Sequence, residues 1–85
     1  MREGKRLAAL LSGGRRDLGM TQFDLAVAVG LKQTVSVSRY ENARSIPDPQ
    51  VFARMIEVLG LDAEEAWPAW GLAYAERTRS ALAEL

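Results

Sequence analysis

Residues 19–42 read GMTQFDLAVAVGLKQTVSVSRYEN, and this stretch decides the fold. It contains two short amphipathic segments separated by Gly30, and each segment opens with small polar residues. The second segment carries hydroxyls, an amide and an arginine opposite its apolar positions. Two short helices joined by a tight turn, the second with a polar open face, are typical of a helix-turn-helix DNA reader.

The first of these two helices has clear boundary signals. Thr21 can cap its start, and Asp24 follows three residues later, as in a capping box. Gly30 is expected to end the helix in the left-handed conformation. The predicted inward stripe consists of Leu25, Ala26 and Val29. Phe23 and Val27 lie on a neighbouring face, where packing against the C-terminal segment is favoured over a partner surface.

The second helix is predicted from residue 33 or 34 to Asn42. Val37, Tyr40 and Glu41 recur at helical spacing and should point inward. Asn42 is expected to end the helix, since asparagine tolerates the left-handed region. The residues left toward solvent or DNA are Ser36, Ser38 and Arg39.

Three further helices flank this pair. The first is predicted over residues 3–18 and runs through Gly13 and Gly14, where two glycines weaken it. The next begins at the Asp48 cap and Pro49, with the core stripe Phe52, Met55, Ile56 and Leu59, and closes at Gly60. The last is capped by Asp62 with Glu65 at the box position, should be kinked or split at Pro68, and resumes to about residue 84.

These elements predict an all-α, compact five-helix domain without strands. We expect residues 1–61 to form the helix-turn-helix domain and residues 62–85 to form a C-terminal helical extension for packing or dimerisation. At 85 residues the chain buries a limited core, so a partner surface or a dimer would add stability.

Composition argues against catalysis. The chain has no cysteine and no histidine, which removes disulfides, thiol metal sites and the commonest catalytic base. It also lacks a glycine-rich phosphate loop, and its carboxylates do not cluster with ligand spacing, so we expect no enzyme, metal or cofactor. No apolar run reaches membrane-spanning length and no signal peptide is evident, which predicts a cytoplasmic protein without membrane contact.

Charge is divided unevenly along the chain although the net charge is zero. Residues 1–46 hold eight Lys/Arg against four Asp/Glu, whereas residues 47–85 hold three against seven. The basic half is suited to meet phosphate while the acidic half stays away from it. Chance asymmetry in a small protein is the alternative.

An ordered set of residues resembles the lambda-repressor-like (phage repressor and Cro type, XRE-like) helix-turn-helix family. The matching positions are Thr21-Gln22, Leu25-Ala26, Gly30, residues 37–42, Pro47 and residues 59–61. The resemblance covers about residues 7–61 and implies a regulator that reads DNA through its second motif helix. It implies a phosphate contact for Gln22, backbone contacts for Asn42 and Arg44, and a structural ion pair between Arg15 and Glu41.

Two departures from the family pattern affect the expected contacts. Gly30 and Glu41 are eleven residues apart instead of the usual ten. Counting back from Glu41, the base-reading positions are Thr34, Val35 and Arg39; counting forward from Gly30, they are Gln33, Thr34 and Ser38. Lys32 and Ser36 are candidates for phosphate contact, and for Lys32, Gln33 and Ser36 the alternative is an ordinary solvated surface. The glycine expected after the second helix is replaced by Asn42-Ala43.

The extension carries the aromatic residues that the resemblance leaves unexplained. Its apolar seam consists of Trp67, Trp70, Tyr74, Ala81, Leu82 and Leu85. The seam could cover the core or form a dimer interface, or it could be split with Trp67 inside and residues 74–85 at the interface. Two paired readers about 34 Å apart would match one turn of duplex DNA.

Together these observations predict a sequence-specific transcriptional regulator of prokaryotic or phage origin. We expect a homodimeric repressor that reads an inverted-repeat operator in double-stranded DNA. The alternative is an antitoxin-type or other interaction module, whose acidic aromatic tail binds a partner protein.

Overall fold

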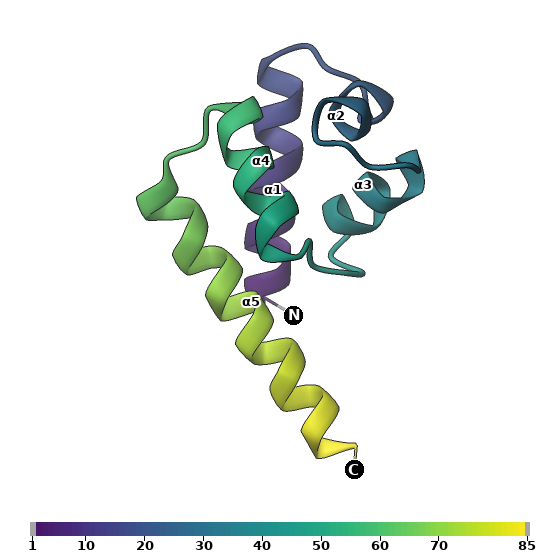
Figure 1. The fold of residues 1–85 in the computed structure, drawn as a ribbon. Helices are drawn as coiled ribbons and strands as arrows, with labels where there is room; N and C mark the ends of the chain where they lie inside the picture. The colour runs from purple at the N-terminus through teal and green to yellow at the C-terminus, as the bar shows by residue number, and fades with distance from the viewer. Residues whose placement is uncertain (1, 85) are drawn as a thin grey trace.

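The computed structural model describes residues 2–84, which form five helices and no strand. In chain order these are α1 (Arg2–Asp17), α2 (Gln22–Ala28), α3 (Thr34–Glu41), α4 (Pro49–Leu59) and α5 (Ala63–Ala83). Figure 1 shows α2 and α3 on one side of α1 and α5 on the other, with α4 nearby. The expected all-α, five-helix fold is confirmed.

One hydrophobic core joins all five helices. Its largest fully buried side chains include Leu11, Leu25, Val37, Phe52 and Met55. The predicted stripes of α2 and α4 supply much of this set, which confirms their helical periodicity. The first half of α5 belongs to the same core, because its small residues Ala66, Ala69 and Ala73 are buried.

The two glycines of α1 do not interrupt the helix, as expected. A Cβ at Gly14 would come within 3.0 Å of Leu61 Cδ2 and 3.4 Å of Leu59 Cβ. Gly14 therefore lets α1 lie close to the end of α4. A Cβ at Gly13 would meet no atom within 4 Å, so packing does not require that glycine.

Side-chain caps fix the starts of three helices. The Asp24 amide donates to Thr21 Oγ1 at 3.0 Å and the Thr21 amide donates to Asp24 Oδ2 at 2.9 Å, which completes the predicted capping box. Asp48 accepts from the Val51 amide at 2.9 Å. Asp62 caps α5 through the amide of Glu64 rather than through a box with Glu65.

Pro68 lies inside the continuous α5, so of the two outcomes expected there, a kink or a split, the split is wrong. The proline is the sixth helical residue, and the carbonyl that loses its donor is that of Glu64, in the exposed first turn. Solvent can satisfy that carbonyl. Burial of Ala66 and Ala69 on either side of the proline holds the helix against the core.

Phe23 and Val27 do not pack on the C-terminal segment, which corrects the sequence-based expectation. Their side chains are 62% and 61% exposed. The seven-residue α2 turns only a narrow face inward, and α5 lies beyond α1 on the opposite side of the molecule (Figure 1).

The left-handed residue after α3 is Ala43, with φ of 57°, and not Asn42 as expected. Asn42 is the C-cap, with φ of −102°. The Arg44 amide then donates to the Arg39 carbonyl at 2.9 Å, which closes the helix end. An alanine in this conformation has a steric cost, because its Cβ lies close to the following carbonyl.

Replacing Gly13 with alanine should raise the free energy of unfolding by about 1 kcal/mol, because alanine favours helix and its methyl group meets no neighbour. The matched variant Gly14→Ala should gain less, since its methyl group must displace Leu61. Urea denaturation of both variants measures the difference, and equal gains would contradict the packing role of Gly14.

Replacing Ala43 with glycine should stabilise the protein by about 1 kcal/mol, because glycine adopts positive φ without strain. The control Ala53→Gly, at an exposed site within α4, should destabilise it by about 1 kcal/mol. Thermal melts report both signs. A loss of stability in Ala43→Gly would refute strain at this position.

Candidate nucleic-acid interface

One buried residue sets which face of α3 is turned outward. Val37 is fully buried, and it turns the opposite side of the helix to solvent. Val35 and Arg39 lie on that side, one helical turn apart, and both are exposed. Gln33 is the exposed N-cap residue, and its side chain makes no capping hydrogen bond to the helix within the described residues 2–84.

The remaining candidates for base contact are less exposed. Thr34 and Ser38 are half-buried. Ser38 is engaged by Asn42, whose side-chain amide donates to the Ser38 carbonyl at 2.8 Å and to its Oγ at 3.3 Å. Of the base-reading positions counted back from Glu41, Val35 and Arg39 are exposed. Of those counted forward from Gly30, Gln33 is exposed.

Basic side chains flank this face. Lys32 precedes α3 and Arg44 follows it, and both are exposed. Ser36 is half-buried and Asn42 is exposed at the end of the helix. The surface around α3 therefore combines amide, hydroxyl and apolar groups with three cations, counting Arg39. Such a surface can contact both phosphates and base edges.

The structure brings Arg15 and Glu41 together across α1 and α3. Arg15 Nε donates to Glu41 Oε2 at 2.6 Å and Nη2 donates to Oε1 at 2.9 Å, which is a bidentate pair. Arg15 Nη1 also donates to the Met20 carbonyl at 2.8 Å. Gln22 Nε2 donates to Glu41 Oε1 at 3.1 Å, so the start of α2 joins the same network.

This network controls the ionisation of its carboxylate. Burial works to raise the pKa of Glu41, but hydrogen bonds from Arg15 and Gln22, with the nearby charges of Arg15 and Arg16, hold that pKa below its ordinary value. The hydrogen bonds that Arg15 donates to Glu41 in turn raise the pKa of Arg15, against the effect of its burial. Because the folded pKa of Glu41 is lowered, its stabilising effect is present above the ordinary carboxylate pKa and is lost as pH falls through the folded pKa.

Two arginines that the sequence did not single out bind backbone carbonyls near the motif. Arg54 Nη1 donates to the Val29 carbonyl at 3.2 Å, at the end of α2. Arg77 Nη2 donates to the Arg44 carbonyl at 2.6 Å, just beyond α3. Neither contact has a local sequence signal, because 25 and 33 residues separate the partners.

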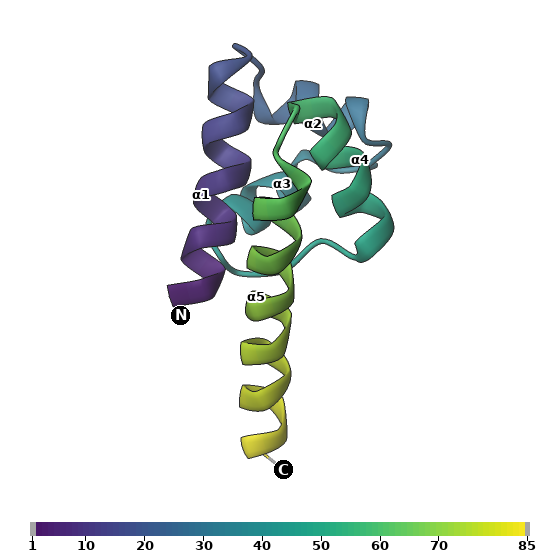
Figure 2. The ribbon, with the colours of Figure 1, turned by 90° about the vertical axis from the view of Figure 1, so that its left-hand side faces the viewer.

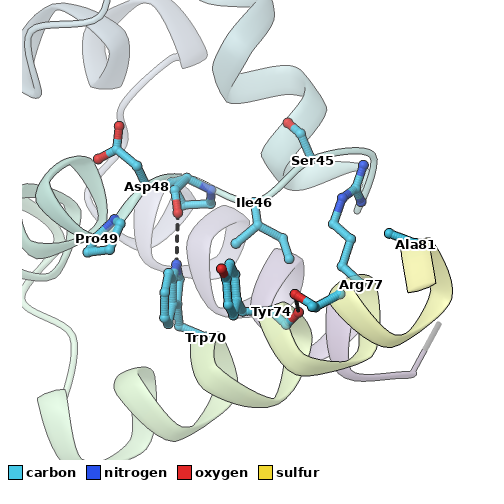
Figure 3. Close-up of a pocket in the computed structure, with 10 residues that line it drawn as sticks. Ser45, Ile46, Asp48, Pro49, Trp70, Tyr74, Arg77 and Ala81 are labelled. Carbon is cyan, nitrogen blue, oxygen red and sulfur yellow. Dashed lines mark hydrogen bonds between the residues drawn. The ribbon is translucent and has the colours of Figure 1, made fainter.

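The aromatic residues of α5 form a row of contacting rings that runs outward from the core, which we call the aromatic ladder. Trp67 meets Phe52 edge-on with ring centroids 4.9 Å apart, and Trp67 and Trp70 are 5.8 Å apart. Trp70 stacks on Tyr74 at 5.2 Å with an angle of 6° between the rings. The indole Nε1 of Trp70 donates to the Pro47 carbonyl at 2.8 Å (Figure 3).

The expected seam is therefore divided along its length. Trp67 and Trp70 are half-buried against the core, whereas Tyr74 is 54% exposed and Leu82 is 62% exposed. Ala81 is also exposed, and Leu85 lies outside the described residues. Burial is divided as in the split alternative, and an interface over residues 74–85 stays a prediction. The fully buried residues of α5 are alanines instead of aromatics.

The chain is similar in sequence to proteins with a helix-turn-helix domain. The helix-turn-helix domain family matches residues 6–67. The ImmF control region 10 kDa protein of Bacillus phage phi105 is 32% identical over 62 residues, covering 73% of this chain and 68% of the phage protein. Multiprotein-bridging factor 1 of Eremothecium gossypii is 45% identical over 51 residues, covering 60% of this chain. The chain spans about a third (33%) of the length of that factor.

A solved structure has a similar fold. The clp gene regulator ClgR from Corynebacterium glutamicum superposes with a TM-score of 0.69 at 23% identity, covering 96% of this chain and 87% of that one. Within residues 2–84, no helix has the length and apolar character needed to cross a membrane.

Replacing Arg15 with alanine should lower the free energy of unfolding by about 2 kcal/mol, because it removes charged hydrogen bonds and leaves Glu41 under-paired. The variant should also lose less stability than the wild type as pH falls below the ordinary carboxylate pKa and through the lowered folded pKa of Glu41, because only the wild type then loses the pair. The control Arg6→Ala, at an exposed site nearer the start of α1, should change little. Urea titrations across this pH range give both readouts, and an unchanged free energy of unfolding in Arg15→Ala would refute the role of the pair.

Proposed function

Because the chain belongs to the helix-turn-helix domain family, we propose that it is a DNA-binding transcription regulator that inserts α3 into the major groove. The observation that carries this proposal is the outer face of α3. Val35 and Arg39 project from it one turn apart, with Gln33 at its N-terminal end. These three side chains are free of the core and lie where such helices approach base edges.

Each of these side chains has a distinct base preference. The Arg39 guanidinium matches guanine O6 and N7, and the Gln33 amide matches adenine N6 and N7. The Val35 side chain suits the thymine methyl group. Thr34 and Ser38 are half-buried and take secondary positions at the edge of this reading surface.

Phosphate contacts would position α3 without reading sequence. Lys32 and Arg44 bracket the helix with exposed charge. Gln22 uses one amide hydrogen on Glu41 and retains a second for a phosphate oxygen. The hydroxyl of Ser36 adds a further backbone contact. The side-chain amide of Asn42 donates to Ser38 in the free protein, so its proposed phosphate contact requires that amide to exchange one of these hydrogen bonds for the phosphate.

We further infer a homodimeric repressor that binds an inverted repeat. A single α3 of eight residues contacts only a short half-site, and two copies related by a twofold axis would double the contacts. Similarity to a phage control-region protein supports a role in gene control, and occlusion of a promoter is the simplest mode for so small a protein.

The alternative is an interaction module in which the C-terminal extension binds another protein. The exposed Tyr74 and Leu82 favour it, as does similarity to proteins called multiprotein-bridging factors. The two functions differ in one measurement. A regulator retains DNA preference as a purified protein, whereas a pure interaction module shows none at moderate ionic strength.

Selection from random duplexes with the purified protein should return a half-site, its spacing and its symmetry. Against that operator, Arg39→Ala should weaken binding by 1–3 kcal/mol, about 5- to 150-fold, and relax preference at one or two base pairs. The loss should be much smaller on scrambled DNA, because only base recognition is removed.

Arg6→Ala is the matched control, since it removes one exposed cation from α1 and leaves α3 intact. Fluorescence anisotropy on operator and scrambled duplexes measures all three proteins. Equal losses on both duplexes in Arg39→Ala would make Arg39 a phosphate contact. Failure of the selection to enrich any sequence would overturn the proposed function.

A further inference from the structure

The loop that follows α3, residues 43–47, carries one of the cations proposed to contact phosphate. Arg44 is exposed in this loop, directly after Ala43 with its left-handed φ of 57°. The Arg44 amide donates to the Arg39 carbonyl at 2.9 Å, which ties the start of the loop to α3. Because an alanine in the left-handed region has a steric cost, the surrounding structure must hold the loop in this path.

Two side chains of α5 hold carbonyls of this loop. Arg77 Nη2 donates to the Arg44 carbonyl at 2.6 Å, and Trp70 Nε1 donates to the Pro47 carbonyl at 2.8 Å. Residues 70 and 77 are about two helical turns apart, so both side chains leave α5 on the same side (Figure 3). Figure 2 shows the loop crossing α5 on its way to α4. The 43–47 loop is therefore held from α5 near its start and at its end.

Packing alone does not fix this loop against α5. A groove of about 500 Å³ lies between residues 45–49 and α5. Pro47 is fully buried and anchors the end of the loop, whereas Arg44 near its start is exposed. In the described residues 2–84, the hydrogen bonds that the loop makes to elements other than α3 are those from Arg77 and Trp70. These two bonds bridge the groove at its ends.

We propose that Arg77 and Trp70 are positioning residues for DNA binding, which hold the 43–47 loop so that Arg44 meets a phosphate at the end of α3. The inference rests on the proposed function and deepens it. A loop held in place before binding loses less conformational freedom on contact with DNA, so the affinity is higher. The positive charge of Arg77 also disfavours a return of the Arg44 guanidinium toward α5, because like charges repel.

The proposal extends the DNA-binding unit beyond the residues matched to the family. That match ends at residue 67, whereas Trp70 and Arg77 lie in the following turns of α5. The C-terminal extension thereby acts on DNA affinity without contacting DNA. Because phosphate contacts carry no sequence information, its effect should be equal on all duplexes, unlike that of Arg39.

Arg77→Ala should weaken binding to operator and scrambled duplexes by the same factor. The dependence of log K on log salt should also become shallower by up to about 0.9 for each reader bound, as for one lost phosphate contact. Arg79→Ala is the matched control, since it removes the same charge from an exposed site of α5 that does not line the groove. Fluorescence anisotropy across a range of salt concentrations gives both readouts. A loss in Arg77→Ala no larger than in Arg79→Ala would overturn the proposal.

Trp70→Phe tests the second contact without a change of charge. It keeps an aromatic ring beside Tyr74 but removes the N–H that holds the Pro47 carbonyl. The salt dependence should again become shallower, whereas a purely structural role would lower the melting temperature and leave the salt dependence unchanged. Trp67→Phe is the control, because Trp67 packs on Phe52 and donates no hydrogen bond to the loop within residues 2–84. A wild-type salt dependence in Trp70→Phe would refute the role of the indole.

A double-mutant cycle separates positioning from direct contact. Arg44→Ala removes the phosphate contact itself, so adding Arg77→Ala should cause no further loss beyond the general effect of charge seen in Arg79→Ala. Independent, additive losses from Arg44→Ala and Arg77→Ala would make Arg77 a phosphate contact in its own right. That result would overturn its role as a positioning residue.

The same measurements separate this inference from the proposed function. If Arg39→Ala loses operator preference while Arg77→Ala and Trp70→Phe bind both duplexes as the wild type does, the proposed reader stands and the positioning role falls. If no sequence is enriched, but Arg77→Ala still makes the salt dependence on random duplexes shallower only when Arg44 is present, the positioning role stands and the base-reading proposal falls.

Discussion

The position of α3 depends on the ion pair between Arg15 and Glu41. The eight-residue α3 has a single fully buried side chain, Val37, which alone would leave its rotation weakly defined. The bidentate pair fixes the C-terminal end of α3 on α1, and Gln22 ties the start of α2 to the same carboxylate. Exposure of Val35 and Arg39 follows, because the opposite side of the helix is held by charge and by packing.

Small side chains explain how α5 joins the core. Burial of Ala66, Ala69 and Ala73 allows α5 to pack closely along α1 without large side chains between them. The bulky aromatic rings are thereby turned to one side. There the contacting rings of Phe52, Trp67, Trp70 and Tyr74 extend from the core to the groove between residues 45–49 and α5. The extension is therefore part of the fold at its start and an open surface at its end.

Local signals were enough to predict most of the helices, and long-range contacts account for the errors. The Thr21 and Asp48 caps and the stripe of α4 act within one or two turns, so sequence spacing reveals them. Pro68 was misjudged because burial of its neighbours outweighs its local cost. The contact between Arg77 and the Arg44 carbonyl joins residues far apart in the chain and could not be predicted. On α3, the extra residue before Glu41 left two registers open, and only the exposure of individual side chains separates their members.

Both tryptophans of the chain belong to the aromatic ladder, and none lies on α2 or α3. Tryptophan emission from this protein therefore originates entirely in α5, from Trp67 against Phe52 and from Trp70, which stacks on Tyr74 and donates to the Pro47 carbonyl. Intrinsic tryptophan fluorescence thus reports on the environment of α5. Nucleotides bound at α3 would change this fluorescence only through movement of the backbone that links α3 to α5.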